Sequence, residues 1–271
     1  MNQTSHKSEK AEKANWKVAA ASVVGTSHLD SGTDCQDRFR WSVFNKDGRD
    51  ILIAVISDGA GSTTDGERGA DIACESFESQ VCSILDITAA GVASLGMDFA
   101  VGWLGHYRKL VKALADEESK ETREFSSTFV AAVADHENAV FFQLGDGGVI
   151  YNSANTEGFC FGIEPDDIEY VNMTNFLMDD DAFEHLKVVH VAESVEDLVL
   201  FSDGITNVAV DHATGSPYEP FLKPMTAPLK NGSSEGLDAK LEAFLSSPSI
   251  NEKTDDDKTL ILASNVGRES S

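Results

Sequence analysis

Three strongly apolar segments of this chain each run into an aspartate followed by glycine, and a fourth apolar segment follows a cluster of aspartates. ILIAVIS, VFFQLG and LVLFS precede Asp58, Asp146 and Asp203, and Asp256 lies just before TLIL. Uninterrupted runs of Val, Ile, Leu and Phe suit strands that are covered on both faces. Carboxylates that gather at strand ends raise one another's pKa unless a cation lies among them, and Mg²⁺ or Mn²⁺ takes such oxygen ligands. The pattern therefore predicts a metal site at the edge of a sheet.

The alternative is that these Asp-Gly pairs are only turns, because both residues tolerate positive φ. Asp47-Gly48 lies between WSVF and DILIAV and predicts a hairpin turn, and Asp65-Gly66 predicts a loop before a helix. Asp58 and Asp203 differ from these pairs, since each follows an apolar run and a serine and precedes no evident partner strand. This difference favours the metal site over the turn.

The length of 271 residues and the lack of a central linker predict one domain over 15–265. A polar tail is expected at 1–14, which we predict to be disordered, and a short C-terminal tail at 266–271. The N-terminal segment lacks the apolar core of a signal peptide, and no stretch reaches the roughly 20 apolar residues that cross a bilayer. We therefore expect a soluble, cytoplasmic protein without a membrane partner.

The charge balance excludes several classes of partner. Lys and Arg number 21 against 46 Asp and Glu, which gives a formal net charge of −25. Such a surface repels nucleic acid and anionic lipid, and the sequence contains no basic patch that could bind a phosphate backbone. We therefore predict no nucleic-acid partner.

The periodicity of the apolar residues predicts an α+β protein. We expect strands over 18–24, 39–44, 51–56, 127–135, 139–145, 148–152, 158–163, 187–191, 198–202 and 259–263. We expect helices over 67–85, 97–117, 179–186 and 237–246, with Asp179 to Asp181 as caps of the third and an irregular segment over 211–236. The close spacing of the strands in 127–152 predicts an antiparallel meander. This order favours antiparallel sheets flanked by helices over a strictly alternating parallel fold.

Six motifs occur in an order that is typical of one known family. They are GTSHLDSGTDCQD at 25–37, SDGAGSTTDGERGAD at 57–71, FSSTFVAAV at 125–133, LGDGG at 144–148, FSDGITN at 201–207 and DDDKTLIL at 255–262. Through them the chain resembles the metal-dependent type-2C protein phosphatases, in particular a compact bacterial branch, over about residues 16–264. The resemblance implies an α-β-β-α sandwich of two stacked antiparallel sheets flanked by helix pairs.

The resemblance also implies a ligand set for two Mg²⁺ or Mn²⁺ ions. By match to the family motifs, Asp58 bridges both ions and the carbonyl of Gly59 binds one of them. Asp203 and Asp256 complete the shell of the other ion, Asp256 being the first residue of a motif that reads Asp-Asn-x-Thr in the family. Asp146 matches a position that can hold a third, weaker ion.

Three departures from the family pattern concern the site. Gln36-Asp37 stands where the family usually has Glu-Asp; an amide is a poorer ligand than a carboxylate, so either the second ion binds more weakly or Asp37 serves instead. The phosphate-binding arginine of the family has no clear counterpart, although His28 lies in that region. Ala60 replaces the histidine that many relatives have as proton donor, and the hypothesis here is that His28 or a metal-bound water takes its part.

The implied activity is hydrolysis of phosphoserine or phosphothreonine in a protein substrate. Two bridged ions lower the pKa of a shared water, orient the phosphate and stabilise the transition state, so no covalent phosphoenzyme is needed. The resemblance to stand-alone bacterial phosphatases implies a signalling role opposite a Ser/Thr kinase.

Two alternatives share the expected fold. One is a catalytically weak or silent binding module, which the departures at Gln36 and Ala60 suggest and the intact Asp58, Asp203 and Asp256 disfavour. The other is a phosphatase for a small phosphorylated metabolite, which differs only in the walls of the site. A haloacid-dehalogenase type is excluded because Ile56 stands where its nucleophilic aspartate would be.

Overall fold

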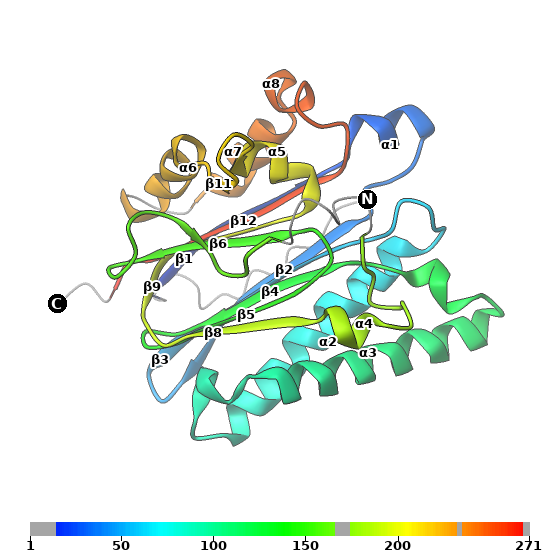
Figure 1. Cartoon of the computed structure of the whole chain (residues 1–271), viewed down its shortest axis with the longest axis horizontal. Helices are drawn as coiled ribbons and strands as arrows, with labels where there is room; N and C mark the ends of the chain where they lie inside the picture. The colour runs from blue at the N-terminus through cyan, green and yellow to red at the C-terminus, as the bar shows by residue number, and fades with distance from the viewer. Residues whose placement is uncertain (1–14, 166–173, 232–234, 268–271) are drawn as a thin grey trace.

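The structure, a computed structural model, describes residues 15–165, 174–231 and 235–267. The tail expected at 1–14 and part of that expected at 266–271 lie outside these residues. Two five-stranded sheets stack face to face, and helices cover their outer faces (Figure 1). The α-β-β-α sandwich is therefore confirmed.

The first sheet has the order β1-β12-β9-β6-β7 and the second the order β2-β3-β4-β5-β8, and the pairs in both are antiparallel. The strands of the first sheet are β1 Trp16–Val23, β12 Lys258–Asn265, β9 Val195–Phe201, β6 Gly148–Ser153 and β7 Cys160–Phe161. Those of the second are β2 Asp37–Lys46, β3 Arg49–Asp58, β4 Phe129–Ala134, β5 Ala139–Leu144 and β8 Lys187–Val191. A small ribbon of β10 Val210–Asp211 and β11 Ser216–Pro217 lies apart from both.

Three apolar cores hold the layers together, and β3 shows why its sequence is apolar throughout. Ile51, Ile53 and Val55 face the helices α2 Gly66–Ile87 and α3 Met97–Glu118, whereas Leu52 and Ala54 face the core between the two sheets. Successive side chains of a strand point to opposite faces, so a central strand in a four-layer sandwich buries both sets. The continuous apolar run is the direct consequence.

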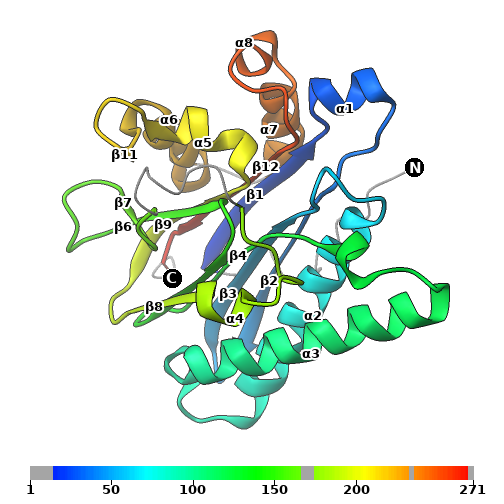
Figure 2. The same ribbon diagram turned by 45° about the vertical axis from the view of Figure 1, so that its right-hand side comes forward.

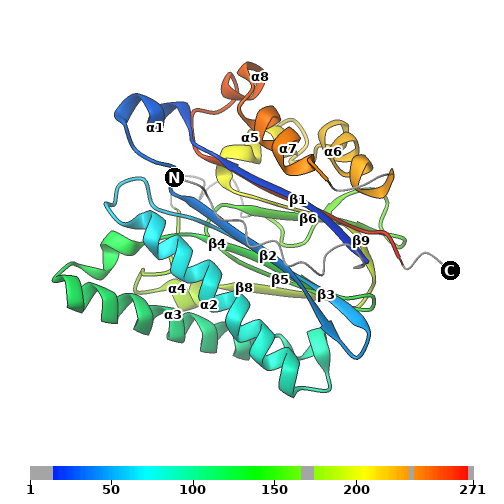
Figure 3. The same cartoon turned by 180° about the vertical axis from the view of Figure 1, so that it is seen from behind.

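The third core lies between the first sheet and its covering helices, which Figures 2 and 3 show on the side opposite α2 and α3. These helices are α5 Thr206–Ala209, α6 Glu219–Asn231 and α7 Leu237–Leu245. The remaining helices are short: α1 Thr26–Ser31, α4 Ala182–His185 and α8 Pro248–Asn251, with 3₁₀ turns at Gly91–Ser94, Thr122–Phe125 and Asp203–Ile205. In the described ranges, no helix combines the length and the apolar character needed to cross a membrane.

The hairpin predicted at Asp47-Gly48 is confirmed. Both residues have positive φ, 52° and 78°, and the strands on either side pair in register from Lys46 opposite Arg49. Positive φ at both central positions is what a tight hairpin of this twist requires, and Asp followed by Gly supplies it at little cost.

The meander expected over 127–152 is wrong in its last strand. β4 and β5 pair as predicted, but β6 leaves that sheet and pairs with β9 in the other one. The connection contains Gly145 with φ 106°, a conformation that favours glycine, and its glycines let the chain change sheets within a few residues. The spacing of strands along the chain could not distinguish a neighbour in the same sheet from one in the sheet behind.

The irregular segment expected over 211–236 is also wrong, because it contains the 13-residue helix α6. Pro224 and Pro228 lie inside this helix. Proline removes a backbone hydrogen-bond donor, so the sequence predicted no helix here. Phe221 and Leu229 on its inner face are buried against the first sheet, so packing outweighs the local cost. The short helix predicted at 179–186 is confirmed as α4, although its N-cap Asp181 makes no capping hydrogen bond.

Candidate metal centre

The sandwich brings the predicted aspartates from both sheets to one edge. Asp37 opens β2 and Asp58 ends β3, and these two residues lie directly opposite each other in the strand register. In the other sheet, Asp203 follows the end of β9 and Asp256 precedes the start of β12. These two strands are antiparallel neighbours. Strands that point in opposite directions thus present their ends at the same place, where four carboxylates meet.

Asp146 joins the group from the connection between β5 and β6, where the chain passes from one sheet to the other. Its carboxylate accepts a hydrogen bond of 2.6 Å from Thr174 Oγ1, so Thr174 lies beside this edge. Asp146 is exposed, in contrast to the buried Asp37. This position suits an outer ligand rather than a central one.

The pKa values show that the five carboxyl groups lie close enough to repel one another. Burial raises the pKa of Asp58 well above its usual range, and the charges of Asp37, Asp203 and Asp256 raise it further. Burial likewise raises the pKa of Asp203 to about 8, with contributions from Asp146, Asp256 and Asp37. Without a cation, this edge therefore holds protons near neutral pH.

The acceptor groups at this edge fit a hard divalent cation. Within the described residues, Asp37 Oδ1 and Asp203 Oδ1 are buried and receive no hydrogen bond. Buried acceptors without a donor are costly, and a cation satisfies them without further protein groups. Among the described residues, no group of three or more His, Cys, Asp or Glu side chains has the spacing of a metal-ion site.

Two hydroxyl residues that the sequence did not single out position the central carboxylates. Ser202 Oγ donates to Asp37 Oδ2 at 2.7 Å and accepts from the backbone N–H of Thr259 at 3.0 Å. Thr128 Oγ1 accepts from the backbone N–H of Asp58 at 3.2 Å. The available signal for Ser202 was the repeated Ser-Asp-Gly triplet, in which only the aspartate was given a role.

A buried lysine lies next to this acidic edge. Lys258 is 0% exposed, and its Nζ donates to the backbone carbonyl of Asp256 at 3.2 Å. Burial lowers the pKa of Lys258, while the neighbouring carboxylates, Asp257 first, oppose that change. The lysine fixes the backbone of a predicted ligand and places a positive group among negative ones.

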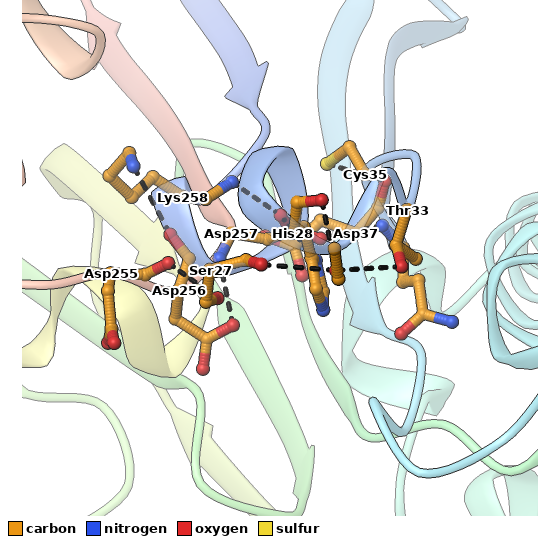
Figure 4. Close-up of polar contacts among 12 residues, drawn as sticks. Ser27, His28, Thr33, Cys35, Asp37, Asp255, Asp256, Asp257 and Lys258 are labelled. Carbon is orange, nitrogen blue, oxygen red and sulfur yellow. Dashed lines mark hydrogen bonds and ion pairs between the residues drawn. The ribbon is translucent and has the colours of Figure 1, made fainter.

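His28 lies on α1 against the end of the last motif. Its Nδ1 is 2.9 Å from Oδ1 of the buried Asp257, and its side chain is 17% exposed (Figure 4). The predicted ligand Asp256 is exposed, whereas its neighbour Asp257 is buried and has no role in the sequence-based prediction. The structure thus places His28 beside the site, and its part in proton transfer stays a prediction.

The other departures have distinct structural settings. Gln36 is 5% exposed, its Nε2 donates to the carbonyl of Thr63 at 3.4 Å, and its buried Oε1 receives no hydrogen bond within the described residues. Ala60 is buried and offers no polar group. Gly59 donates its N–H to the carbonyl of Gln36 at 3.3 Å, so the predicted carbonyl ligand belongs to a strand end tied to the first motif.

A cavity of about 300 Å³ opens beside the loop that follows Asp58. Its walls come from the segments around Ala60, Arg123 and Phe176. The lining residue Arg123 is 81% exposed, so its guanidinium group is accessible from solvent. None of the predicted metal ligands lines this cavity.

Comparison with known proteins identifies the family. The family model described as protein phosphatase 2C matches residues 24–246. The chain is 32% identical over 253 residues to serine/threonine-protein phosphatase 3 of Escherichia coli (strain K12), covering 92% of this chain and 98% of that protein. The chain therefore belongs to the protein phosphatase 2C family, the metal-dependent serine/threonine protein phosphatases.

Solved structures agree with this fold. A crystal structure of a bacterial serine phosphatase superposes with a TM-score of 0.63 at 15% identity, covering 93% of this chain and 99% of that one. Serine/threonine phosphatase Stp1 from Staphylococcus aureus superposes with a TM-score of 0.62 at 15% identity, covering 93% and 95%. At such low identity the likeness concerns the fold alone.

Proposed function

We propose that the acidic edge binds two Mg²⁺ or Mn²⁺ ions and hydrolyses phosphoserine and phosphothreonine in protein substrates. The observation that supports this most directly is the mutual effect on pKa of aspartates that five separate motifs contribute. Acidic side chains that a fold brings together at the cost of raised pKa values are typical of functional sites. The family membership supplies the reaction class.

In this proposal Asp58 would be a ligand shared by the two ions, because carboxylates from both sheets raise its pKa. Asp37 and the carbonyl of Gly59 would hold one ion, and Asp203 and Asp256 would hold the other. Asp146, which is exposed and lies at the margin, would hold a third, weaker ion. When bound, the ions supply an activated water and neutralise charge on the phosphate.

The remaining chemistry is the protonation of the leaving oxygen. Ala60 cannot donate a proton, and His28 is a side chain of the first motif that can. We assign the donor role to His28 Nε2, since Nδ1 faces Asp257. The substrate would be a phosphoprotein whose phosphate a Ser/Thr kinase has added, and the exposed Asp146 and Asp256 leave the edge open to such a partner.

Hydrolysis of 4-nitrophenyl phosphate and of a phosphothreonine peptide, each with Mn²⁺ or with chelator, tests this function. We expect Mn²⁺-dependent turnover of both substrates and a loss of at least about 100-fold in Asp58→Asn. Asp86→Asn, which makes the same charge change at the far end of α2, is the matched control and should behave as the wild type. Full activity of Asp58→Asn in Mn²⁺ would remove this edge from the reaction.

The role of His28 has its own test. A residue that protonates the leaving oxygen matters most when that oxygen is a poor leaving group, as in phosphothreonine, and least for 4-nitrophenolate. We expect His28→Ala to lower kcat on the peptide by about 100-fold and to leave kcat on the aryl phosphate within about 3-fold. Equal losses on the two substrates would contradict the assignment.

A further inference from the structure

Asp257 is a buried carboxylate that accepts hydrogen bonds from two backbone N–H groups of one opposing segment and lies against His28 of the same segment. Its Oδ1 accepts from the backbone N–H of Gly25 at 2.6 Å, and its Oδ2 accepts from that of Gln36 at 2.6 Å. His28 Nδ1 lies 2.9 Å from Oδ1, and the Asp257 side chain is only 2% exposed. A single side chain just before β12 thus holds both ends of the loop that carries His28.

The loop packs so closely on the last motif that its geometry is set by this contact. A Cβ on Gly25 would lie 2.4 Å from the carbonyl oxygen of Asp255, so only glycine fits there. Ser27 donates both its N–H and its hydroxyl to that same carbonyl, at 3.0 Å and 2.8 Å (Figure 4). Hydrogen bonds to a buried carboxylate are stronger than neutral ones, so Asp257 is the main anchor of the loop.

The anchor determines which nitrogen of His28 is available. With Nδ1 held towards Asp257, Nε2 points to the loop that follows Asp58 and Gly59. A Cβ on Gly61 of that loop would be 3.8 Å from His28 Nε2, and glycine keeps this space open. A carboxylate on one ring nitrogen fixes the tautomer and the direction of the other.

This chain has a carboxylate at position 257, where the family motif has asparagine. Asparagine offers a single acceptor oxygen, and its NH₂ group would face one of the backbone N–H groups of Gly25 or Gln36. An aspartate accepts from both backbone N–H groups and also presents a negative charge to His28 Nδ1 at 2.9 Å. The negative charge of Asp257 therefore faces two backbone N–H groups and one ring nitrogen of this loop.

We propose that Asp257 is a positioning residue that holds His28 with Nε2 directed at the leaving oxygen of the substrate. This proposal rests on the proposed role of His28. In the step, water forms a bond to phosphorus, the bond between phosphorus and the seryl or threonyl oxygen breaks, and that oxygen takes the proton from Nε2. His28 keeps its Nδ1 proton towards Asp257 and regains the Nε2 proton from the water that attacked.

Kinetics of Asp257→Asn, His28→Ala and the double variant test the proposal, with 4-nitrophenyl phosphate and a phosphothreonine peptide as substrates in saturating Mn²⁺. We expect Asp257→Asn to lower kcat on the peptide by about 10- to 100-fold and kcat on the aryl phosphate by less than about 3-fold. We expect the double variant to be no slower on the peptide than His28→Ala, because both changes remove the same step.

If Asp257→Asn lowers kcat equally on both substrates and also weakens Mn²⁺ binding in a titration, the proposal is overturned. Asp257 would then have a structural role only. Additive losses in the double variant would overturn it as well. ¹⁵N NMR of the wild type, with His28 assigned from His28→Ala, gives a measurement that needs no folded Asp257 variant. We expect a proton on Nδ1, and a bare Nδ1 would refute the contact. Inactivity of the wild type on both substrates would instead refute the proposed function.

Discussion

The Asp203→Asn variant should be more stable than wild type in the metal-free state. It should be less stable than wild type when metal is bound. Asp203 is a partly buried carboxyl group whose pKa burial and neighbouring carboxylates raise to about 8. In the unfolded chain the same group loses its proton near pH 4. Asparagine has the same shape and no charge, so it removes the repulsion and also removes a proposed ligand.

The sign follows from proton binding. Between about pH 4 and pH 8 the folded, metal-free protein binds more protons at Asp203 than the unfolded chain does, so the free energy of unfolding falls as pH rises. The full shift corresponds to about 4 kcal/mol at pH 7. Partial exposure and sharing of protons with neighbouring carboxyl groups reduce this, and we expect Asp203→Asn to gain about 1 to 2 kcal/mol.

Urea denaturation followed by tryptophan fluorescence measures the effect, in chelator at pH 5 and pH 8 and again in Mn²⁺. We expect the gain in chelator to be larger at pH 8 than at pH 5, and to reverse in Mn²⁺, because wild type then gains the free energy of metal binding. Asp86→Asn is the charge-matched control. An Asp203→Asn protein that is no more stable than wild type in chelator at pH 8 would refute the convergence of these carboxylates.

Three further predictions concern the support of the site. Burial alone would raise the pKa of Asp65, but hydrogen bonds led by that from Lys120 lower it to about 2. Its contribution is present in full above about pH 4 and is lost as pH falls through about 2, so Asp65→Asn should cost about 1 kcal/mol in urea denaturation at pH 7 and much less at pH 2. Phe77→Ala empties a fully buried position among aromatic rings and should cost about 3 to 5 kcal/mol by the same denaturation assay, whereas Phe77→Leu should cost clearly less. Gly59→Ala would place a Cβ 2.4 Å from the carbonyl carbon of Gly66, and we expect a lower melting temperature together with at least about 10-fold lower kcat.

The sequence predicted the aspartates of the site because their local setting is distinctive. Asp58 and Asp203 each follow a buried run and a serine, and the structure places both at one edge. The same reasoning missed Asp257, because an aspartate beside a predicted ligand looks like a second copy of it. Only the fold shows that the carboxylate of Asp256 remains exposed while that of Asp257 turns inward to Gly25 and His28.

Local sequence alone determined the two-faced apolar strands, the Asp-Gly turn at residues 47 and 48 and the order of the motifs, since each depends on residues that are neighbours in the chain. Tertiary structure decided that β6 joins the sheet of β9, and that α6 forms in spite of its prolines. It also decided that His28 meets Asp257. These outcomes depend on surfaces that become neighbours only after the two sheets have stacked, and the free energy of burying those surfaces exceeds the local preferences that the sequence displays.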